Sequence, residues 1–179
     1  PVHEYYFTSS SNYQNLTDMQ TYYMAKFGLV LHLMGITLMV GTTIANFAAY
    51  QQLWKYLYRE KDKATMVINV TKRFPMLQGI GGILIIAGGA TMMSAFHGVV
   101  IHQFWFQVKL AVLLLIIINP ILLMRPAAIK LRHMLSIQQP VAAINPADVD
   151  MVRKRLVLFH SLQLAFFLLI FILSAFRFS

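Results

Sequence analysis

Residues 104–124 read FWFQVKLAVLLLIIINPILLM and contain one charged side chain, that of Lys109. An α-helix rises about 1.5 Å per residue, so about 20 mostly apolar residues are enough to cross the ~30 Å hydrocarbon core of a bilayer. Three further stretches meet this criterion and lie at about 27–49, 74–96 and 156–176. The sequence therefore predicts an all-α fold, an integral membrane four-helix bundle formed by one domain over residues 1–179.

The composition also indicates a membrane protein. Of the 179 residues, 58% are hydrophobic and 12% are charged, and the mean hydropathy is +0.62, which is more apolar than soluble domains of this size. The chain has no cysteine, which excludes disulfides, cysteine-bound zinc, iron–sulfur clusters and thioether-linked haem. Residues 1–23 lack the basic and apolar regions of a signal peptide. We expect them to form an outer segment that is flexible or covers the outer mouth of the bundle.

Basic residues predict the orientation of the bundle. The connections at residues 50–73 and 125–155 carry six each of the 15 basic residues: Lys55, Arg59, Lys61, Lys63, Lys72 and Arg73 in the first, and Arg125, Lys130, Arg132, Arg153, Lys154 and Arg155 in the second. The positive-inside rule makes these the inner loops of an antiparallel bundle with both termini outside, in a bacterial-type cytoplasmic membrane. Orientation thus accounts for the net charge of +9. We expect membrane lipid, through its anionic headgroups, as the partner of these loops, and no nucleic acid.

Polar and small residues at helical spacing predict the faces that point into the bundle. These faces comprise His32, Gly35, Met39, Thr43, Asn46 and Tyr50 in the first span, Gln78, Gly82, Gly89 and Met93 in the second, and His160, Gln163, Phe167, Ile170, Ser174 and Arg177 in the fourth. For the glycines, close helix packing is favoured over contact with a ligand. Pro120 predicts a kink in the third span, and residues 135–150 are expected to form an irregular linker.

Three ionisable residues lie at membrane depth, namely His32, Lys109 and His160, and such residues usually mark function. By helix rise, His32 and Lys109 lie about 8 Å inside the outer boundary, and His160 about 6 Å inside the inner one. The two histidines are then roughly 16 Å apart across a ~30 Å core, whereas two axial ligands of one metal stand about 4 Å apart. They should not bind the same iron.

Each histidine is a candidate metal ligand at its own depth. An outer haem would use His32 with Lys109, with His97 or His102 of the outer turn, or with water. An inner haem would use His160, with or without His133 of the inner loop. The alternative is that each membrane histidine only hydrogen-bonds a neighbouring helix, and that Lys109 extends its ammonium group to the outer surface.

Two segments resemble a known family. Residues 32–35, HLMG, resemble the His-x-x-Gly segment of the HemJ-type protoporphyrinogen oxidases and the related CopD-like membrane haem proteins, and residues 105–110, WFQVKL, are similar to their Trp-x-x-x-Lys-Leu segment. The spacing within residues 159–177 also fits, so the resemblance covers all four spans. It implies a b-type haem on His32, with Lys109 contributing to a porphyrin or quinone site.

Three positions depart from the family pattern. Met39 stands where the family usually has Trp, the third span has Asn119-Pro120 in place of a later His, and the fourth has His160-Ser161 where Asn-Glu is usual. A changed site indicates a changed activity. The resemblance therefore implies haem binding more directly than protoporphyrinogen oxidation.

The leading hypothesis is a membrane redox protein that binds haem b, as one haem or as two at different depths. It would transfer electrons to a redox partner, or oxidise a porphyrin-like or quinol substrate with Lys109 as the candidate catalytic residue; whether it is an enzyme is left open. The alternative is a non-haem transporter, channel or assembly subunit in which the membrane His and Lys residues bind protons or a substrate. Transport would require a homo-oligomer, because four helices leave little room for it.

Overall fold

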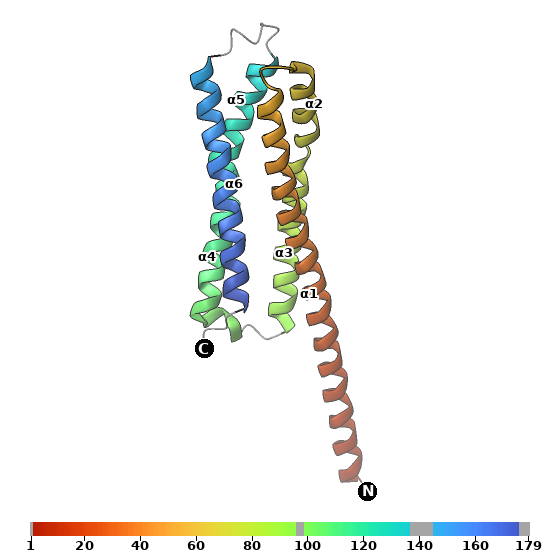
Figure 1. Ribbon diagram of the computed structural model, residues 1–179. Helices are drawn as coiled ribbons and strands as arrows, with labels where there is room; N and C mark the ends of the chain where they lie inside the picture. Colours follow the sequence, from red (N-terminus) through yellow and green to blue (C-terminus); the bar gives the residue numbers. More distant parts are fainter. Residues whose placement is uncertain (1, 96–98, 137–144, 176–179) are drawn as a thin grey trace.

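The computed structural model describes residues 2–95, 99–136 and 145–175, and over these ranges the protein is all-helical (Figure 1). The elements are α1 (Val2–Tyr56), α2 (Lys61–Thr71), α3 (Phe74–Ala95), η1 (Val99–His102), α4 (Phe104–Asn119), η2 (Pro120–Met124), α5 (Arg125–Ser136) and α6 (Pro146–Ala175). Four helical segments are long and apolar enough to cross a membrane, and they are Thr17–Tyr56, Asp62–Ala95, Phe104–Leu135 and Pro146–Ala175. The prediction of four membrane helices is confirmed.

Successive segments are joined at alternate ends of the bundle (Figure 1). We call one end of the bundle the basic end. It consists of the last turns of α1, of α2, of α5 and of the first turns of α6, and these elements contact one another. It carries both of the basic stretches identified in the sequence. The opposite end holds η1 and the start of α4 (Figure 1).

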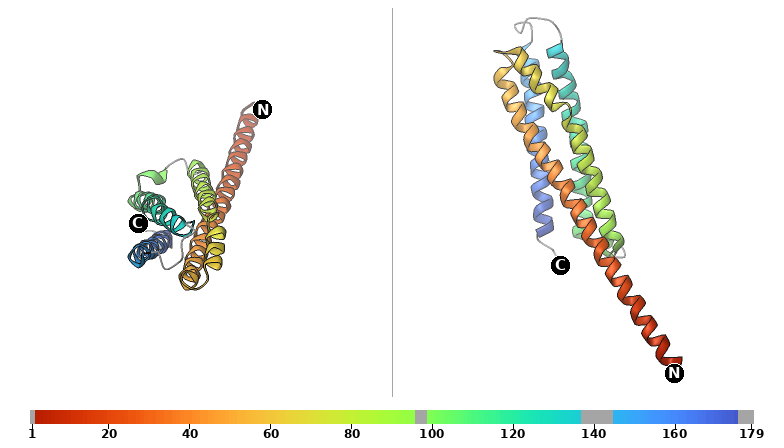
Figure 2. Two further views of the ribbon diagram at one scale, coloured as in Figure 1. Left: turned by 90° about the horizontal axis from the view of Figure 1, so that it is seen from above. Right: turned by 90° about the vertical axis from the view of Figure 1, so that its right-hand side faces the viewer.

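The helices are longer than a bilayer requires. The shortest of the four segments has 30 residues, or about 45 Å of helix against a hydrocarbon core of ~30 Å. The described residues of the connections at 50–73 and 125–155 are largely helical, and α6 begins at Pro146 inside the stretch that we expected to be an irregular linker; residues 137–144 of that stretch lie outside the described residues. Residues 2–16 belong to α1, which continues away from the bundle (Figure 2); they do not cover the end of the bundle, as one of our two expectations for this segment had it.

Two hydrophobic clusters hold the helices together. The larger lies at the basic end and includes Leu53, Leu57, Leu131, Leu156 and Phe159, each no more than 2% exposed. The smaller lies within the spans and joins Met39 and Ile85 to Val112, Ile116 and Phe167. The most deeply buried core thus belongs to the basic end.

Glycines set the contact between α1 and α3. A Cβ atom on Gly88 would lie 2.5 Å from the carbonyl oxygen of Gly28, and one on Gly35 would lie 2.6 Å from that of Gly81. Only residues without side chains allow two helix backbones to approach this closely. The prediction that the glycines allow close helix packing is confirmed at these positions. The register differs by one residue from our expectation, because Gly81 and Gly88 face α1, whereas the sequence pattern had indicated Gly82 and Gly89.

The third span continues through Pro120 with a local change of winding. Pro120 has no N–H group, so the carbonyl of Ile116 loses its usual intrahelical donor. The Nε2 atom of Gln163 on α6 donates to this carbonyl instead, at 3.4 Å, and residues Pro120–Met124 form one π-helical turn. The expected kink position is therefore a π segment, which is a common way for a helix to absorb such a disruption.

Candidate functional site

His32 lies on the face of α1 that packs against α3. Its Nδ1 atom is 2.9 Å from the carbonyl oxygen of Ile85. Since a carbonyl only accepts hydrogen bonds, Nδ1 carries the proton and Nε2 has a free lone pair in the neutral ring. A backbone carbonyl that fixes the tautomer in this way is a common second-shell partner of metal-binding histidines.

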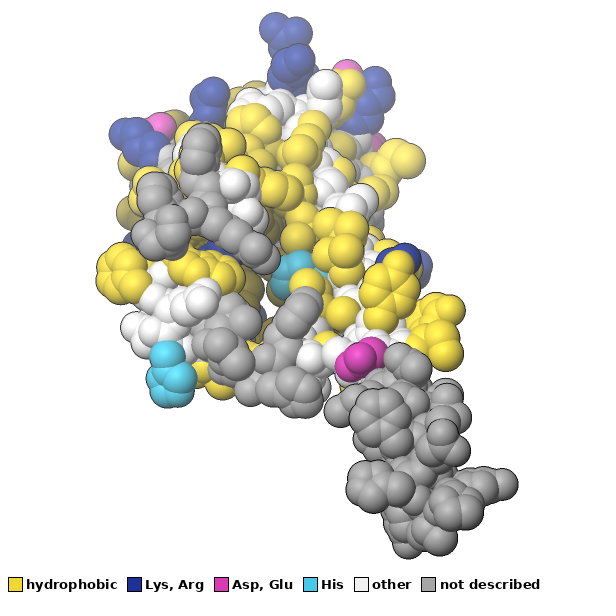
Figure 3. Space-filling view, turned by 90° about the horizontal axis from the view of Figure 1, so that it is seen from below, with side chains coloured by type: hydrophobic (Ala, Val, Ile, Leu, Met, Phe, Trp, Pro, Cys, Tyr) yellow, Lys and Arg dark blue, Asp and Glu magenta, His cyan; other side chains and the backbone are white. Residues whose placement is uncertain are grey.

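The surroundings of the His32 ring are partly open. The side chain is half-buried, and Gly89 of α3 lies beside the ring, where a Cβ would be 3.8 Å from Nδ1. Figure 3 views the protein from the end opposite the basic end, and shows histidine side chains on this side, one of them within a hollow among hydrophobic side chains. The His32 ring is therefore only half-buried and has no side chain of α3 beside it at position 89.

Lys109 is positioned by its own helix. Its Nζ atom stands 4.6 Å from the ring centroid of Trp105, one turn earlier in α4, and the side chain is half-buried. This cation–π contact keeps the ammonium group close to the start of α4. The Trp-x-x-x-Lys spacing noted in the sequence thus produces a direct contact between its two named residues.

His160 lies in the middle of a ring of aromatic side chains. It is 1% exposed, and its ring centroid is 4.7 Å from that of Phe159, 5.4 Å from that of Phe47 and 5.8 Å from that of Tyr50. Its Nδ1 atom is 2.6 Å from the carbonyl oxygen of Leu156, while its Nε2 atom is buried and has no hydrogen-bond partner. An unprotonated Nε2 atom could bind a metal ion, but the three aromatic rings occupy the space next to it that a haem would need.

The two histidines are far apart in the structure. His160 packs against Phe47 and Tyr50, which follow His32 on the same helix by 15 and 18 residues. At about 1.5 Å per residue, this separation is roughly 22 to 27 Å along α1. The geometry agrees with the prediction that His32 and His160 do not share one iron.

The remaining candidate histidines contribute less to a site. His97 lies outside the described residues. His102 ends η1 and is exposed, and His133 is exposed on α5. Within the described part of the chain, no three His, Cys, Asp or Glu side chains lie close enough together to hold a metal ion.

Buried polar side chains connect the spans next to His160. Asn119 of α4 donates from Nδ2 to Gln163 Oε1 at 2.8 Å and to the carbonyl of Phe159 at 3.1 Å. On the other side of the bundle, Gln78 of α3 donates to Thr43 of α1 at 3.0 Å. The sequence pattern identified three of these side chains as inward-facing, but it did not pair them. Asn119 was noted only as part of the Asn119-Pro120 departure from the family.

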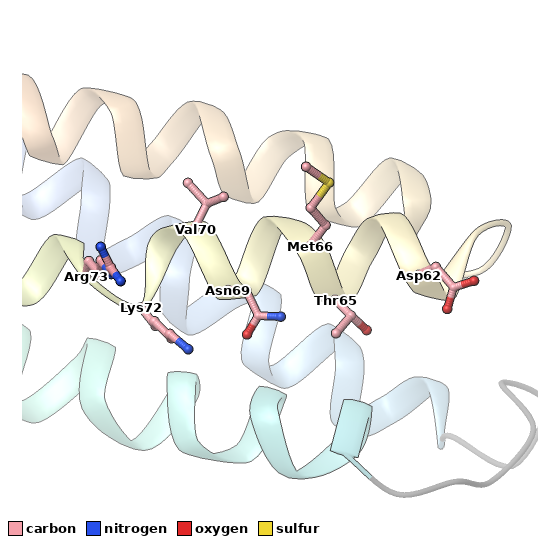
Figure 4. A pocket seen from close by; sticks show the side chains of 7 residues that line it. All are labelled: Asp62, Thr65, Met66, Asn69, Val70, Lys72 and Arg73. Atoms are coloured by element: carbon pink, nitrogen blue, oxygen red, sulfur yellow. The ribbon is translucent and has the colours of Figure 1, made fainter.

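A surface hollow of about 640 Å³ lies at the basic end, and no histidine lines it (Figure 4). It is lined by one face of α2 and by the residues that follow it: Asp62, Thr65, Met66, Asn69, Val70, Lys72 and Arg73. The lining mixes both signs of charge with exposed apolar side chains. It lacks the apolar walls and the histidine that a haem site requires.

Comparison with known proteins adds no relative. No protein-family model, no curated protein and no solved structure matches this chain. The resemblance described above therefore depends on the two sequence segments of the first and third spans and on the spacing within the fourth.

Proposed function

We propose that this protein is an integral membrane haem-b protein in which His32 is an axial ligand. The observation that carries the proposal is the Nδ1 contact to the Ile85 carbonyl, which places the proton of the neutral ring on Nδ1 and leaves the Nε2 lone pair available to a metal. A non-covalent haem suits a chain without cysteine, because imidazole is a sufficient ligand and the spans supply an apolar pocket.

The ligand set that we propose is narrower than the one the sequence left open. Of the two membrane histidines, only His32 has a partly open ring; the ring of His160 is enclosed by Phe47, Tyr50 and Phe159. One haem near His32 therefore fits better than two. Lys109, held near the start of α4 by Trp105, is placed to interact with an anionic group such as a propionate or a substrate carboxylate.

The chemistry that a haem supplies is reversible one-electron transfer. Around it, the Ile85 carbonyl would hold the His32 ring in one tautomer and orientation, and Gly89 of α3 would leave the side of that ring free of a bulky side chain. The function proposed is electron transfer, or oxidation of a porphyrin-like or quinol substrate. We further propose that the bundle is antiparallel, with both termini outside and the basic end in the cytoplasm, because that end carries the charge excess.

The visible absorption spectrum tests the haem proposal. The wild-type protein, His32→Ala and His133→Ala would be purified from cells that make haem, and their spectra recorded oxidised and after dithionite. We expect a Soret band in the wild type and in the matched control His133→Ala, and its loss in His32→Ala. Colourless wild-type protein would refute haem binding. A Soret band that survives in His32→Ala but is lost in His160→Ala would place the haem at the inner depth instead.

A further inference from the structure

Two hydrogen-bond acceptors are buried without a donor near the contact of α1 with α6 and η2. They are the Nε2 atom of His160 and the Oδ1 atom of Asn46. The first side chain is 1% exposed and the second 0%. Buried polar atoms are nearly always paired, by protein or by ordered water, and leaving one unpaired is costly in a low-dielectric interior.

The neutral His160 ring needs a donor at Nε2. Its Nδ1 atom is already committed, because it lies 2.6 Å from the Leu156 carbonyl, which can only accept a hydrogen bond. Nε2 is therefore an acceptor. Phe47 and Phe159 offer no donor, and the hydroxyl of Tyr50, whose side chain interacts with that of Thr71, does not hydrogen-bond Nε2.

Asn46 faces the same junction from α1. It lies one residue before Phe47 and one turn before Tyr50, the two residues of α1 that contact the His160 ring. Its Nδ2 group points to the sulfur of Met124 at 3.9 Å, a weak acceptor, and this leaves Oδ1 with two unused lone pairs.

The polar side chains of the neighbouring helix positions donate their hydrogen bonds to other groups and not to His160 or Asn46. Gln78 donates to Thr43, the Thr43 hydroxyl donates to the Met39 carbonyl, and Asn119 donates to Gln163 and Phe159. Two acceptors cannot satisfy each other. Each of them therefore requires a donor that no hydrogen bond of the described side chains supplies.

We propose that water is bound at this junction and donates to His160 Nε2 and Asn46 Oδ1. Proteins hold about one buried water per 27 residues, usually with two to four polar partners, and two fully buried orphan acceptors beside a flexible methionine form such a site. The bound water links α1 to α6 in the part of the bundle where the two helices meet. This site is separate from His32 and does not depend on haem binding.

Nitrogen NMR of the full chain in lipid nanodiscs tests the proposal. With ¹⁵N-labelled histidine, we expect the His160 ring to be neutral, with the proton on Nδ1 and an Nε2 shift typical of a hydrogen-bonded acceptor. We also expect a cross-peak from water to the carbon-bound ring protons next to Nε2. The signal would be assigned by its loss in His160→Gln or, if that variant misfolds, by contacts to the rings of Phe47 and Phe159.

Substitution of the second acceptor provides the comparison. Asn46→Leu should weaken the water cross-peak and move the Nε2 shift toward that of an unbonded nitrogen, whereas Ile44→Leu, on the exposed side of α1, should change neither. Three results would each overturn the proposal. They are an unbonded Nε2 without a water cross-peak, a ring protonated on both nitrogens, and a hydrogen-bonded Nε2 that shows a cross-peak to a protein donor and none to water.

Discussion

The substitution Gly88→Ala tests how closely α1 and α3 must approach. A Cβ atom at this position would lie 2.5 Å from the Gly28 carbonyl oxygen, 2.6 Å from the His32 backbone nitrogen and 3.0 Å from the His32 Cα atom. All three are backbone atoms, which cannot turn aside as a side chain would. Since ordinary contact begins near 3.4 Å, the two helices would have to separate by about 1 Å.

Two effects with opposite signs determine the size of the change. Overpacking of a tight interface costs about 1–3 kcal/mol, and replacing a helical glycine with alanine gains up to about 1 kcal/mol in helix propensity. We therefore expect Gly88→Ala to lower the free energy of unfolding by about 1–2 kcal/mol. Gly79→Ala is the matched control, because it lies on the same helix and a Cβ there meets nothing within 4 Å. It should be neutral or stabilising, by up to about 1 kcal/mol.

The assay is reversible unfolding by denaturant in detergent micelles, followed by far-ultraviolet circular dichroism, with both variants measured beside the wild type. If Gly88→Ala and Gly79→Ala unfold with the same free energy, the close approach of α1 and α3 is wrong. A second readout connects this contact to the proposed site. Because the added methyl group displaces the backbone of His32, Gly88→Ala should also weaken or shift any Soret band, and Gly79→Ala should leave it unchanged.

Three further predictions follow from particular contacts. Gln163→Leu removes the side-chain donor to the Ile116 carbonyl and also the acceptor of Asn119 Nδ2, and leaving these groups unpaired should cost about 1–3 kcal/mol each in the unfolding assay. Pro120→Ala restores the intrahelical donor to Ile116, so the double variant should lose less than the sum of the two single variants. If the loss of unfolding free energy in the double variant equals the sum of the losses in the two single variants, Gln163 does not replace the donor that Pro120 lacks. In a chain without native cysteine, an impermeant maleimide added to intact cells should label Gln20→Cys and should not label Arg59→Cys until the membrane is opened; the reverse pattern would invert the proposed orientation. Lys130→Ala removes an ion pair to Asp148 of 2.6 Å whose partners are 40% and 38% exposed, so it should change stability by less than about 1 kcal/mol, and a larger loss would show that this pair is not a solvated surface contact.

Hydropathy located the four spans because lipid leaves the backbone few choices. Within hydrocarbon every N–H and C=O group must be bonded inside the protein, which makes a long apolar run helical. The inward faces could be predicted for a similar reason, since polar groups such as those of Thr43, Asn46 and Gln163 avoid lipid. These parts of the fold depend on the solvent around the helix more than on its neighbours.

The parts that sequence reasoning missed depend on neighbours. Helices α2 and α5 lie in basic, polar stretches, and the residues that bury them, such as Ala64 and Leu131, have meaning only once the helices contact each other. The glycine register is a second case. Gly81 and Gly82 differ by a rotation of about 100° around the helix, and which of them faces α1 is decided by the fit of the two backbones.

His160 shows how the same limit affects a candidate site. An intramembrane histidine is the same signal in sequence whether its ring is enclosed or open, so His32 and His160 received similar interpretations. The structure separates them by their contacts: one has glycine beside it and is half-buried, and the other has three aromatic rings within 5.8 Å.

The division of packing along the bundle gives this difference a physical basis. The larger hydrophobic cluster holds the basic end together, and His160 lies beside it, where well-packed rings exclude a large ligand and only a molecule as small as water is compatible with the contacts. His32 lies toward the other end, where the helices share the smaller cluster and glycine takes the place of bulky side chains. A bundle that is stabilised by the packing at one end can be open enough for a prosthetic group at the other, because the residues that stabilise the fold are then different from those that contact the ligand. On this reasoning, variants in the larger cluster such as Leu53→Ala should reduce stability far more than they change any haem spectrum, and Gly89→Leu should do the opposite.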